Sequence, residues 1–281
     1  WETVTTLDFG FDSRLFNNNF GIVFDWYRRT TSDMHSPGIT LPNSFGTTVP
    51  RRNYGELQTT GWEVAIDWNK SFTNGLNFNV TGMLSDFQEK ITKYENTTMG
   101  INSYYEGKVL GEIWGYETDR YFTADDFVKD ANGNFVLENG RYVLNDGVPN
   151  QSIYESGWFF YGPGDIKYKD LNGDGKIDRG AQTVDDHGDM KVIGNSTPRY
   201  QYGLRLNADW KGIDLSVFMQ GVGKREMWAN GPLFIPGYRA GEAWYAHQLD
   251  YWTPENPNAF YPRPTDQEGS SVANNSRNFL P

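Results

Sequence analysis

The sequence contains no cysteine in its 281 residues, which excludes a disulfide scaffold and thiolate sites for zinc or iron–sulfur clusters. Long apolar runs are missing too, and no run approaches the roughly 20 residues that a membrane-spanning helix needs. Basic residues are outnumbered, 25 against 36 acidic ones, which gives a net charge of −11. Because nucleic-acid binding depends on neutralising phosphates, we expect no nucleic-acid partner.

Residue patterns for catalysis and for organic cofactors are also absent. The histidines His35, His187 and His247 are far apart in the sequence, and no glycine-rich stretch ends in the Gly-Lys-Ser/Thr of a phosphate loop. Glu63 and Asp67 share one face of an expected strand, but they stand roughly 13 Å apart, too far for a catalytic pair of carboxylates. The sequence therefore predicts neither an enzyme nor an organic cofactor.

What the sequence does have is a regular alternation of apolar and polar residues with a period of two. In one segment Trp62, Val64, Ile66 and Trp68 alternate with polar or small residues. Successive side chains of a strand point to opposite faces, so each such segment has one apolar and one polar face. The alternation predicts strands near residues 3–15, 19–31, 55–70, 75–90, 199–211 and 213–222.

These predicted strands differ from those of soluble domains in length and in their connections. They run roughly 9–13 residues, about what a tilted strand needs to cross a bilayer. Tight turns such as Asn74-Gly75 alternate with long polar connections at 32–54, 91–198 and 224–281. The predicted fold class is therefore all-β: residues 1–281 form part of one transmembrane antiparallel β-barrel domain with long extracellular loops. Aromatic residues near the ends of the apolar rows would form its interfacial girdles: Trp26, Trp62, Trp68 and Trp210.

A soluble alternative stays open at this point. A secreted, calcium-dependent carbohydrate-binding β-sandwich would also be acidic and aromatic, and its strands would alternate between core and solvent. A connection as long as residues 91–198 would be anomalous inside such a compact domain. In the barrel, the even-numbered residues of 200–210 would face lipid and the odd-numbered ones the lumen. Dependence on detergent or lipid would separate the two alternatives.

The connection 91–198 also contains a motif typical of calcium loops, beyond a small predicted hairpin at residues 134–144. Residues 170–178 follow the EF-hand order of oxygen ligands, with glycine at the sixth position and a backbone carbonyl at the seventh. The acid expected at position 12 is replaced by Ala181, so Asp185, Asp186 or Asp189 would have to fold back. The alternative is a turn held by Asx hydrogen bonds without metal. The candidate Ca²⁺ ligands are Asp170, Asn172, Asp174, the Lys176 carbonyl, Asp178 and Asp189.

The sequence resembles the SusC/RagA family of TonB-dependent outer-membrane transporters from Bacteroidetes. The resemblance extends in order over nearly the whole chain. It also shows one departure, because many relatives carry an acid soon after the calcium-like loop, whereas residues 179–184 intervene here before Asp185. The matching stretches are Trp1-Glu2 with residues 10–12, then 25–31, 53–57 with 61–63, 164–178, 193–200, 214–221 and 252–256.

This resemblance implies a parent protein in the bacterial outer membrane, a 22-stranded barrel with an N-terminal plug. It implies import of oligosaccharides or peptides together with a SusD-like surface lipoprotein, driven by TonB. The chain would correspond to a middle-to-late segment of the barrel, without the plug and the TonB box. The chain opens on Trp1 without the basic and apolar regions of a signal peptide, which fits a mature, trimmed or internal sequence. The expected partners are outer-membrane lipid, the lipoprotein, TonB and the imported substrate.

Overall fold

The computed structural model describes residues 1–38, 44, 46, 49–155, 159–229, 231–236, 238 and 243–264. The chain divides into two compact units, of which the first comprises residues 1–112 and 194–226 and the second residues 113–193 and 227–281. That residues 1–281 are part of one β-barrel domain with long loops stays a prediction. No helix among the described residues is long and apolar enough to cross a membrane.

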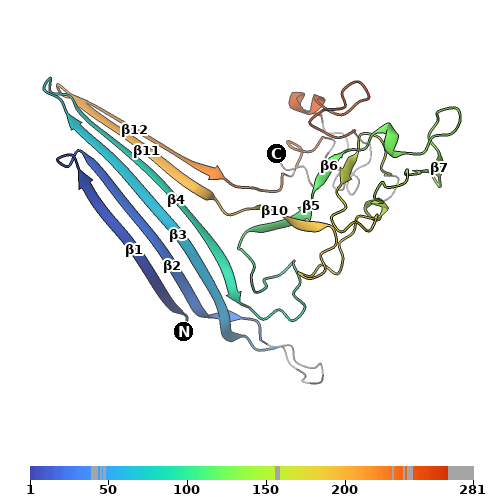
Figure 1. Cartoon of the computed structure of the whole chain (residues 1–281), viewed down its shortest axis with the longest axis horizontal. Helices are drawn as coiled ribbons and strands as arrows, with labels where there is room; N and C mark the ends of the chain where they lie inside the picture. The colour runs from blue at the N-terminus through green and yellow to red at the C-terminus, as the bar shows by residue number, and fades with distance from the viewer. Residues whose placement is uncertain are drawn as a thin grey trace. The chain divides into compact units, whose positions relative to one another are not determined.

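The first unit is a six-stranded antiparallel sheet in the order β1-β2-β3-β4-β11-β12, as Figure 1 shows. The fold class predicted from the alternation, all-β with long antiparallel strands, is confirmed. The strands β4 and β11 are neighbours although 105 residues separate them in the sequence, since β4 ends at Lys93 and β11 begins at Arg199. The bounds are β1 Thr3–Leu15, β2 Phe20–Ser36, β3 Arg52–Ser71, β4 Asn77–Lys93, β11 Arg199–Trp210 and β12 Ile213–Lys224.

Three of these strands extend further than the alternation indicates. β2 continues to Ser36 and β3 begins at Arg52, so both ends of the expected 32–54 loop are paired strand. The pairing continues past irregularities in register on either side of Met34. β4 likewise continues to Lys93, beyond the expected start of the 91–198 loop. These extensions carry few apolar residues and no regular apolar row, so backbone pairing defines them.

Tight turns at one end of the sheet set the register of the strand pairs. The β11–β12 turn has positive φ angles at Lys211 (49°) and Gly212 (83°), the combination that a two-residue hairpin turn requires. Asn17 and Asn18 adopt similar left-handed angles between β1 and β2. Asparagine and glycine tolerate this region, which explains why polar turn residues occur at these positions.

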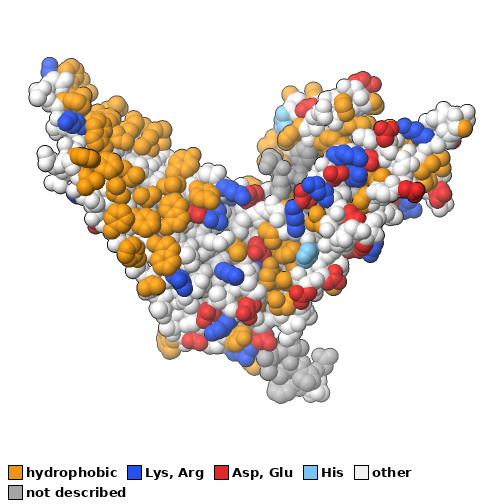
Figure 2. All heavy atoms as spheres, viewed as in Figure 1, with side chains coloured by type: hydrophobic (Ala, Val, Ile, Leu, Met, Phe, Trp, Pro, Cys, Tyr) orange, Lys and Arg blue, Asp and Glu red, His pale blue; other side chains and the backbone are white. Residues whose placement is uncertain are grey.

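The two faces of the sheet differ in chemistry. One face carries the apolar rows, and Figure 2 shows apolar side chains gathered over the six strands. Its side chains are exposed in this chain, among them Phe9 (65%), Leu215 (61%) and Met219 (48%). A strand register that pairs Leu204 with Met219 on one side and with Gly82 on the other keeps these rows on one face. An exposed apolar face of this extent is typical of a surface that meets lipid or protein.

The second unit has its own aromatic core, so residues 113–193 are a folded unit rather than a plain loop. Phe122, Ile166, Tyr168 and Ile177 are at most 1% exposed. Short strand pairs and single turns of 3₁₀ helix surround this core. They are β5 (Glu112–Tyr116) with β10 (Met190–Asn195), β6 (Thr118–Tyr121) with β9 (Ile166–Tyr168), β7 (Leu137–Glu138) with β8 (Arg141–Tyr142), and the helices η2 (Ala124–Asp126), η3 (Ser152–Tyr154) and η4 (Ala246–Leu249).

Candidate functional site

A chain of polar side chains crosses the polar face of the sheet in the first unit. The Asp67 carboxylate accepts hydrogen bonds from Arg14 and Asn69, each at 2.7 Å. Further bonds link Asn69 to Asn79, Asn79 to Asn207, and Asn207 to Ser216. This series of side-chain hydrogen bonds joins β1, β3, β4, β11 and β12. Such hydrogen-bonded polar groups suit a surface in contact with water.

The calcium-like loop of the second unit is shaped by its own side chains. The Asp170 carboxylate accepts hydrogen bonds from the backbone N–H groups of Gly173 (2.6 Å) and Gly175 (2.8 Å). Asn172 Oδ1 accepts from Asp174 N at 2.9 Å, and Asp174 Oδ1 accepts from Lys176 N at 3.0 Å. These are Asx turns, which bring the oxygen-bearing side chains of residues 170–176 around one short stretch of backbone.

An internal cation lies between two of the candidate ligands. Lys176 Nζ lies 2.7 Å from Asp178 Oδ2 and 3.5 Å from Asp174 Oδ2. The Lys176 ammonium, together with the Gly180 N–H, lowers the pKa of the Asp178 carboxyl below its ordinary value. The Asp178 carboxyl is therefore ionised at neutral pH, as a ligand of a cation must be.

Asp189 is the acid that returns to this loop. Its carboxylate is fully buried and accepts hydrogen bonds from Leu171 N (2.8 Å) and Asp178 N (2.9 Å), so it joins both ends of the motif. Asp186 instead closes a local turn, in which its N–H donates to Thr183 Oγ1. No group of three or more His, Asp or Glu within the described ranges is arranged to hold a metal ion. Calcium binding at residues 170–189 stays a prediction.

The loop is connected to a neighbouring turn by two backbone hydrogen bonds. Asn150 N donates to Gly175 O and Ile177 N donates to Asn150 O, both at 2.9 Å. The adjacent Gln151 is 2% exposed, and its side-chain amide bonds to the backbone of Ile166 and Tyr168. The turn is therefore held between the loop and the aromatic core.

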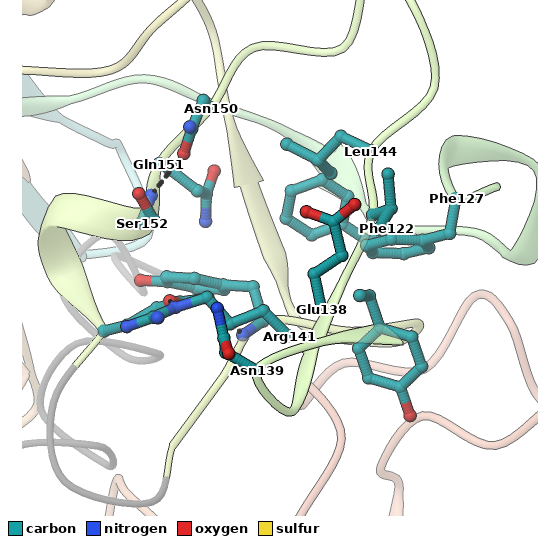
Figure 3. A pocket seen from close by; sticks show the side chains of 13 residues that line it. Phe122, Phe127, Glu138, Asn139, Arg141, Leu144, Asn150, Gln151 and Ser152 are labelled. Atoms are coloured by element: carbon teal, nitrogen blue, oxygen red, sulfur yellow. Dashed lines mark hydrogen bonds and ion pairs between the residues drawn. The ribbon is translucent and has the colours of Figure 1, made fainter. Parts of the chain in front are cut away.

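This turn forms one side of a cavity of about 320 Å³ in the second unit. The β7–β8 hairpin, which turns at Asn139 and Gly140 with φ angles of 53° and 83°, forms another side. Figure 3 shows Asn150, Gln151 and Ser152 on one side of the space and Glu138 across from them. Four aromatic residues also line it, and they are Phe122, Phe127, Tyr142 and Tyr161.

The charged groups at this cavity are unequally paired. Arg141 Nε donates to Glu155 Oε2 at 2.6 Å, and the Arg141 guanidinium lies 4.9 Å from the centre of the Phe160 ring. Glu155 Oε1 also accepts from Tyr161 N at 3.2 Å. Glu138 stands opposite Arg141 in the hairpin register, yet its carboxylate forms no hydrogen bond or ion pair with any residue that the structure describes. The cavity thus offers one unpaired carboxylate.

Sequence reasoning missed a second arrangement, between the turn at 162–165 and a later segment. Asp165 is fully buried, and its carboxylate binds the Arg263 guanidinium at 2.6 and 3.2 Å. Gly164 adopts φ +90°, and a side chain there would collide with the Trp252 ring. The sequence Gly162-Pro-Gly-Asp165 is typical of a turn. Its partners, Trp252 and Arg263, lie about 90 residues further along the chain, and no local sequence pattern identifies them.

The chain is similar in sequence to TonB-dependent receptors. No protein-family model matches the chain. Two curated proteins of Formosa agariphila, the TonB-dependent receptors P26 and P3, are 27% and 28% identical to it over 94% and 95% of its length. The chain spans about a quarter of the length of these relatives, 24% and 25%. The resemblance to TonB-dependent transporters that the sequence indicates is thereby confirmed.

Solved structures agree with this result at the level of the fold. The structure of the RagAB peptide transporter matches all of this chain with a TM-score of 0.59 at 18% identity. The same importer in its open-open state matches 92% of the chain with a TM-score of 0.57 at 17% identity. The chain covers 27% and 25% of those two structures. The predicted fold class, a segment of an antiparallel β-barrel, is thereby confirmed.

Proposed function

We propose that this chain is one sector of a TonB-dependent importer in the bacterial outer membrane. The two-faced sheet carries the proposal, because its apolar face is exposed and its opposite face bears a continuous chain of hydrogen-bonded polar groups. In a barrel wall the first face meets lipid and the second lines the lumen. The edge strands β1 and β12 each pair on one side only among the described strands, and neighbouring strands of the parent would complete them.

The proposal extends to the substrate and the partners. The relatives are named as receptors, and the RagAB complex is named as a peptide importer. We infer that the parent imports oligosaccharides or peptides, driven by TonB, with a SusD-like lipoprotein at its extracellular side. An apolar face without a covering sheet in the described chain favours this function over a secreted carbohydrate-binding sandwich, whose sheets bury such a face.

We also propose that the loop at residues 170–189 binds Ca²⁺ and stiffens the second unit. Its support is the donor set, which consists only of oxygens from carboxylates, an amide and a backbone carbonyl, the chemistry that calcium prefers. The Asp189 carboxylate accepts hydrogen bonds from both ends of the motif and would replace the missing acid at position 12. The role is structural, because calcium holds loops together and does no redox chemistry.

The import proposal is tested in cells that produce the parent protein. Uptake of fluorescent peptides and oligosaccharides is compared between cells with the parent gene, cells without it, and cells that lack TonB. The expected result is uptake of at least one substrate class that requires both the parent and TonB. A parent that is soluble and monodisperse without detergent, or uptake that is equal in all three strains, would contradict the proposal.

A further inference from the structure

We propose that the cavity beside the β7–β8 hairpin binds a primary ammonium group, with Glu138 as its counter-ion. The choice of peptides as the source of that ammonium rests on the proposed import function. The cavity itself is an observation of the second unit alone, and its volume of about 320 Å³ accommodates a lysine side chain or the first residue of a peptide.

The charge at the cavity favours a cationic ligand. Arg141 is neutralised by Glu155, while the Glu138 carboxylate has no partner within the described part of the chain. The three charged residues therefore leave a net charge of −1 beside the opening. By contrast, Glu56 at the cavity formed by β2, β3 and β4 already accepts hydrogen bonds from Thr92 and Lys93. An unpaired carboxylate attracts a cationic donor, and the resulting charge-assisted hydrogen bond is a strong one.

The aromatic rings at the cavity are packed against one another. The centres of the Phe122 and Phe127 rings are 5.3 Å apart with a 44° angle between their planes, and those of Phe127 and Tyr142 are 5.3 Å apart at 54°. Rings at these separations and angles are in direct contact, so they form a fixed apolar wall against which the methylene groups of a lysine side chain can pack.

The same geometry disfavours a sugar ring at this cavity. A pyranose stacks on one flat, open aromatic face, whereas Phe122, Phe127 and Tyr161 are 0%, 2% and 4% exposed. Rings that are buried to this extent present no open platform. An ammonium is small enough to use such a wall, and its three N–H groups can reach Glu138 and the polar atoms of the Asn150–Ser152 turn.

The experiment uses the purified full-length parent in detergent and measures equilibrium binding by calorimetry. One probe is Nα-acetyl-lysine amide, which offers a side-chain ammonium, and a second is alanyl-alanine amide, which offers a chain-terminal one. Nα-acetyl-norleucine amide keeps the aliphatic side chain without the charge, and a neutral maltooligosaccharide represents sugars. We expect saturable binding of at least one ammonium probe. The probe that binds shows whether the cavity takes a lysine side chain or the N-terminus of a peptide.

Two isosteric variants make the test specific. Glu138→Gln should weaken binding of the ammonium probe about tenfold or more, as loss of a charge-assisted hydrogen bond predicts. Glu106→Gln removes the same charge from an exposed position in the first unit and should leave binding unchanged. Both are conservative changes on exposed side chains, so both proteins should fold.

Several outcomes would overturn the inference. They are no saturable binding of either ammonium probe to the wild type, equal binding by Glu138→Gln, and equal or tighter binding of the norleucine or sugar probe. Because the readout is binding, its failure leaves the import proposal standing. Conversely, loss of TonB-dependent uptake with intact ammonium binding would contradict the import proposal alone.

Discussion

Arg14 on β1 reaches Asp67 on β3 at 2.7 Å, across the intervening strand β2. The residue between them in the register is Gly21, which pairs with both Arg14 and Asp67. A Cβ at Gly21 would overlap the Arg14 guanidinium and the Asp67 carboxylate. The ion pair therefore depends on a missing side chain in a strand, where glycine otherwise only weakens the sheet.

Gly21→Ala should accordingly destabilise the parent barrel. The new methyl group displaces the ends of the flexible Arg14 and Asp67 side chains, so the expected cost is that of the partly exposed ion pair, about 1 kcal/mol or less. The control is Gly82→Ala on β4, where a Cβ has no heavy atom within 4 Å. That change should be neutral or slightly stabilising, since alanine loses less backbone entropy than glycine. The measurement is reversible unfolding in lipid, and equal effects of the two changes would refute this explanation.

The orientation of β11 gives a second prediction. Leu204 lies in the apolar row beside Met219 and Gly82, whereas Arg205 lies on the opposite face with its guanidinium 5.7 Å from the Phe218 ring. Leu204→Arg should cost about 2–4 kcal/mol if the residue lies near the bilayer midplane. Arg205→Leu should be mild, because its side chain faces water. Equal costs in a lipid-folding assay would show that the assignment of the faces is wrong.

How far the sequence predicts this structure depends on the kind of interaction. The long strands are predictable because each apolar row repeats every two residues, as in Trp62 to Trp68. The fold of the second unit is not predictable in this way. Its core brings Phe122 together with Tyr161 and Ile166, which are far apart in the sequence and belong to no repeating apolar pattern. The calcium-like motif is visible as a string, and Asp189 was one of three candidates. Which of the three acids reaches the loop depends on the path of residues 179–188, and local sequence patterns do not determine that path.

The ion pair between the buried Asp126 and the partly exposed Arg120 predicts how the second unit responds to acid. Burial alone would raise the pKa of Asp126, but hydrogen bonds from Arg120, at 2.6 Å to each oxygen, and from Thr123 outweigh it and lower that pKa well below its ordinary value. A carboxyl with a lowered folded-state pKa stabilises the fold above its unfolded pKa, near 4, and loses that contribution as pH falls through the folded value. Protection of the Phe122 amide from hydrogen exchange should therefore fall below about pH 4.

Asp126→Asn should reduce that acid dependence and destabilise the unit at neutral pH by about 1–3 kcal/mol. The figure is below the usual cost of breaking a buried ion pair because the Arg120 side chain is 43% exposed. Lys167, which lies 3.4 Å from Asp126, would also lose a partner. The check is hydrogen exchange of residues 118–128 in the parent as a function of pH. An unchanged pH profile in Asp126→Asn would assign the acid response to other carboxyls.

An excised fragment of residues 1–281 should not form a closed barrel in lipid. The described chain supplies six long strands with two unpaired edges, and the smallest outer-membrane barrels have about eight strands. Exposed edges of this length favour pairing with other chains. The fragment should therefore aggregate or remain protease-sensitive after refolding with lipid. A heat-modifiable, protease-resistant species from the fragment alone would contradict this prediction.

The calcium-like loop offers a test in which two neighbouring changes have opposite effects. Asp174→Ala removes a candidate ligand, so it should abolish or strongly weaken saturable Ca²⁺ binding by the parent, which we expect in the 10⁻⁴–10⁻³ M range of extracellular modules. Lys176→Gln keeps the Lys176 backbone carbonyl but removes the ammonium that lies between Asp174 and Asp178. Since that ammonium competes with a metal for the same carboxylates, the change should strengthen Ca²⁺ binding while weakening the loop without calcium. Titration followed by calorimetry measures both effects. If the wild type and both variants show no saturable binding up to about 10 mM, above that range, the motif is an Asx-stabilised turn and Lys176 is its permanent counter-ion.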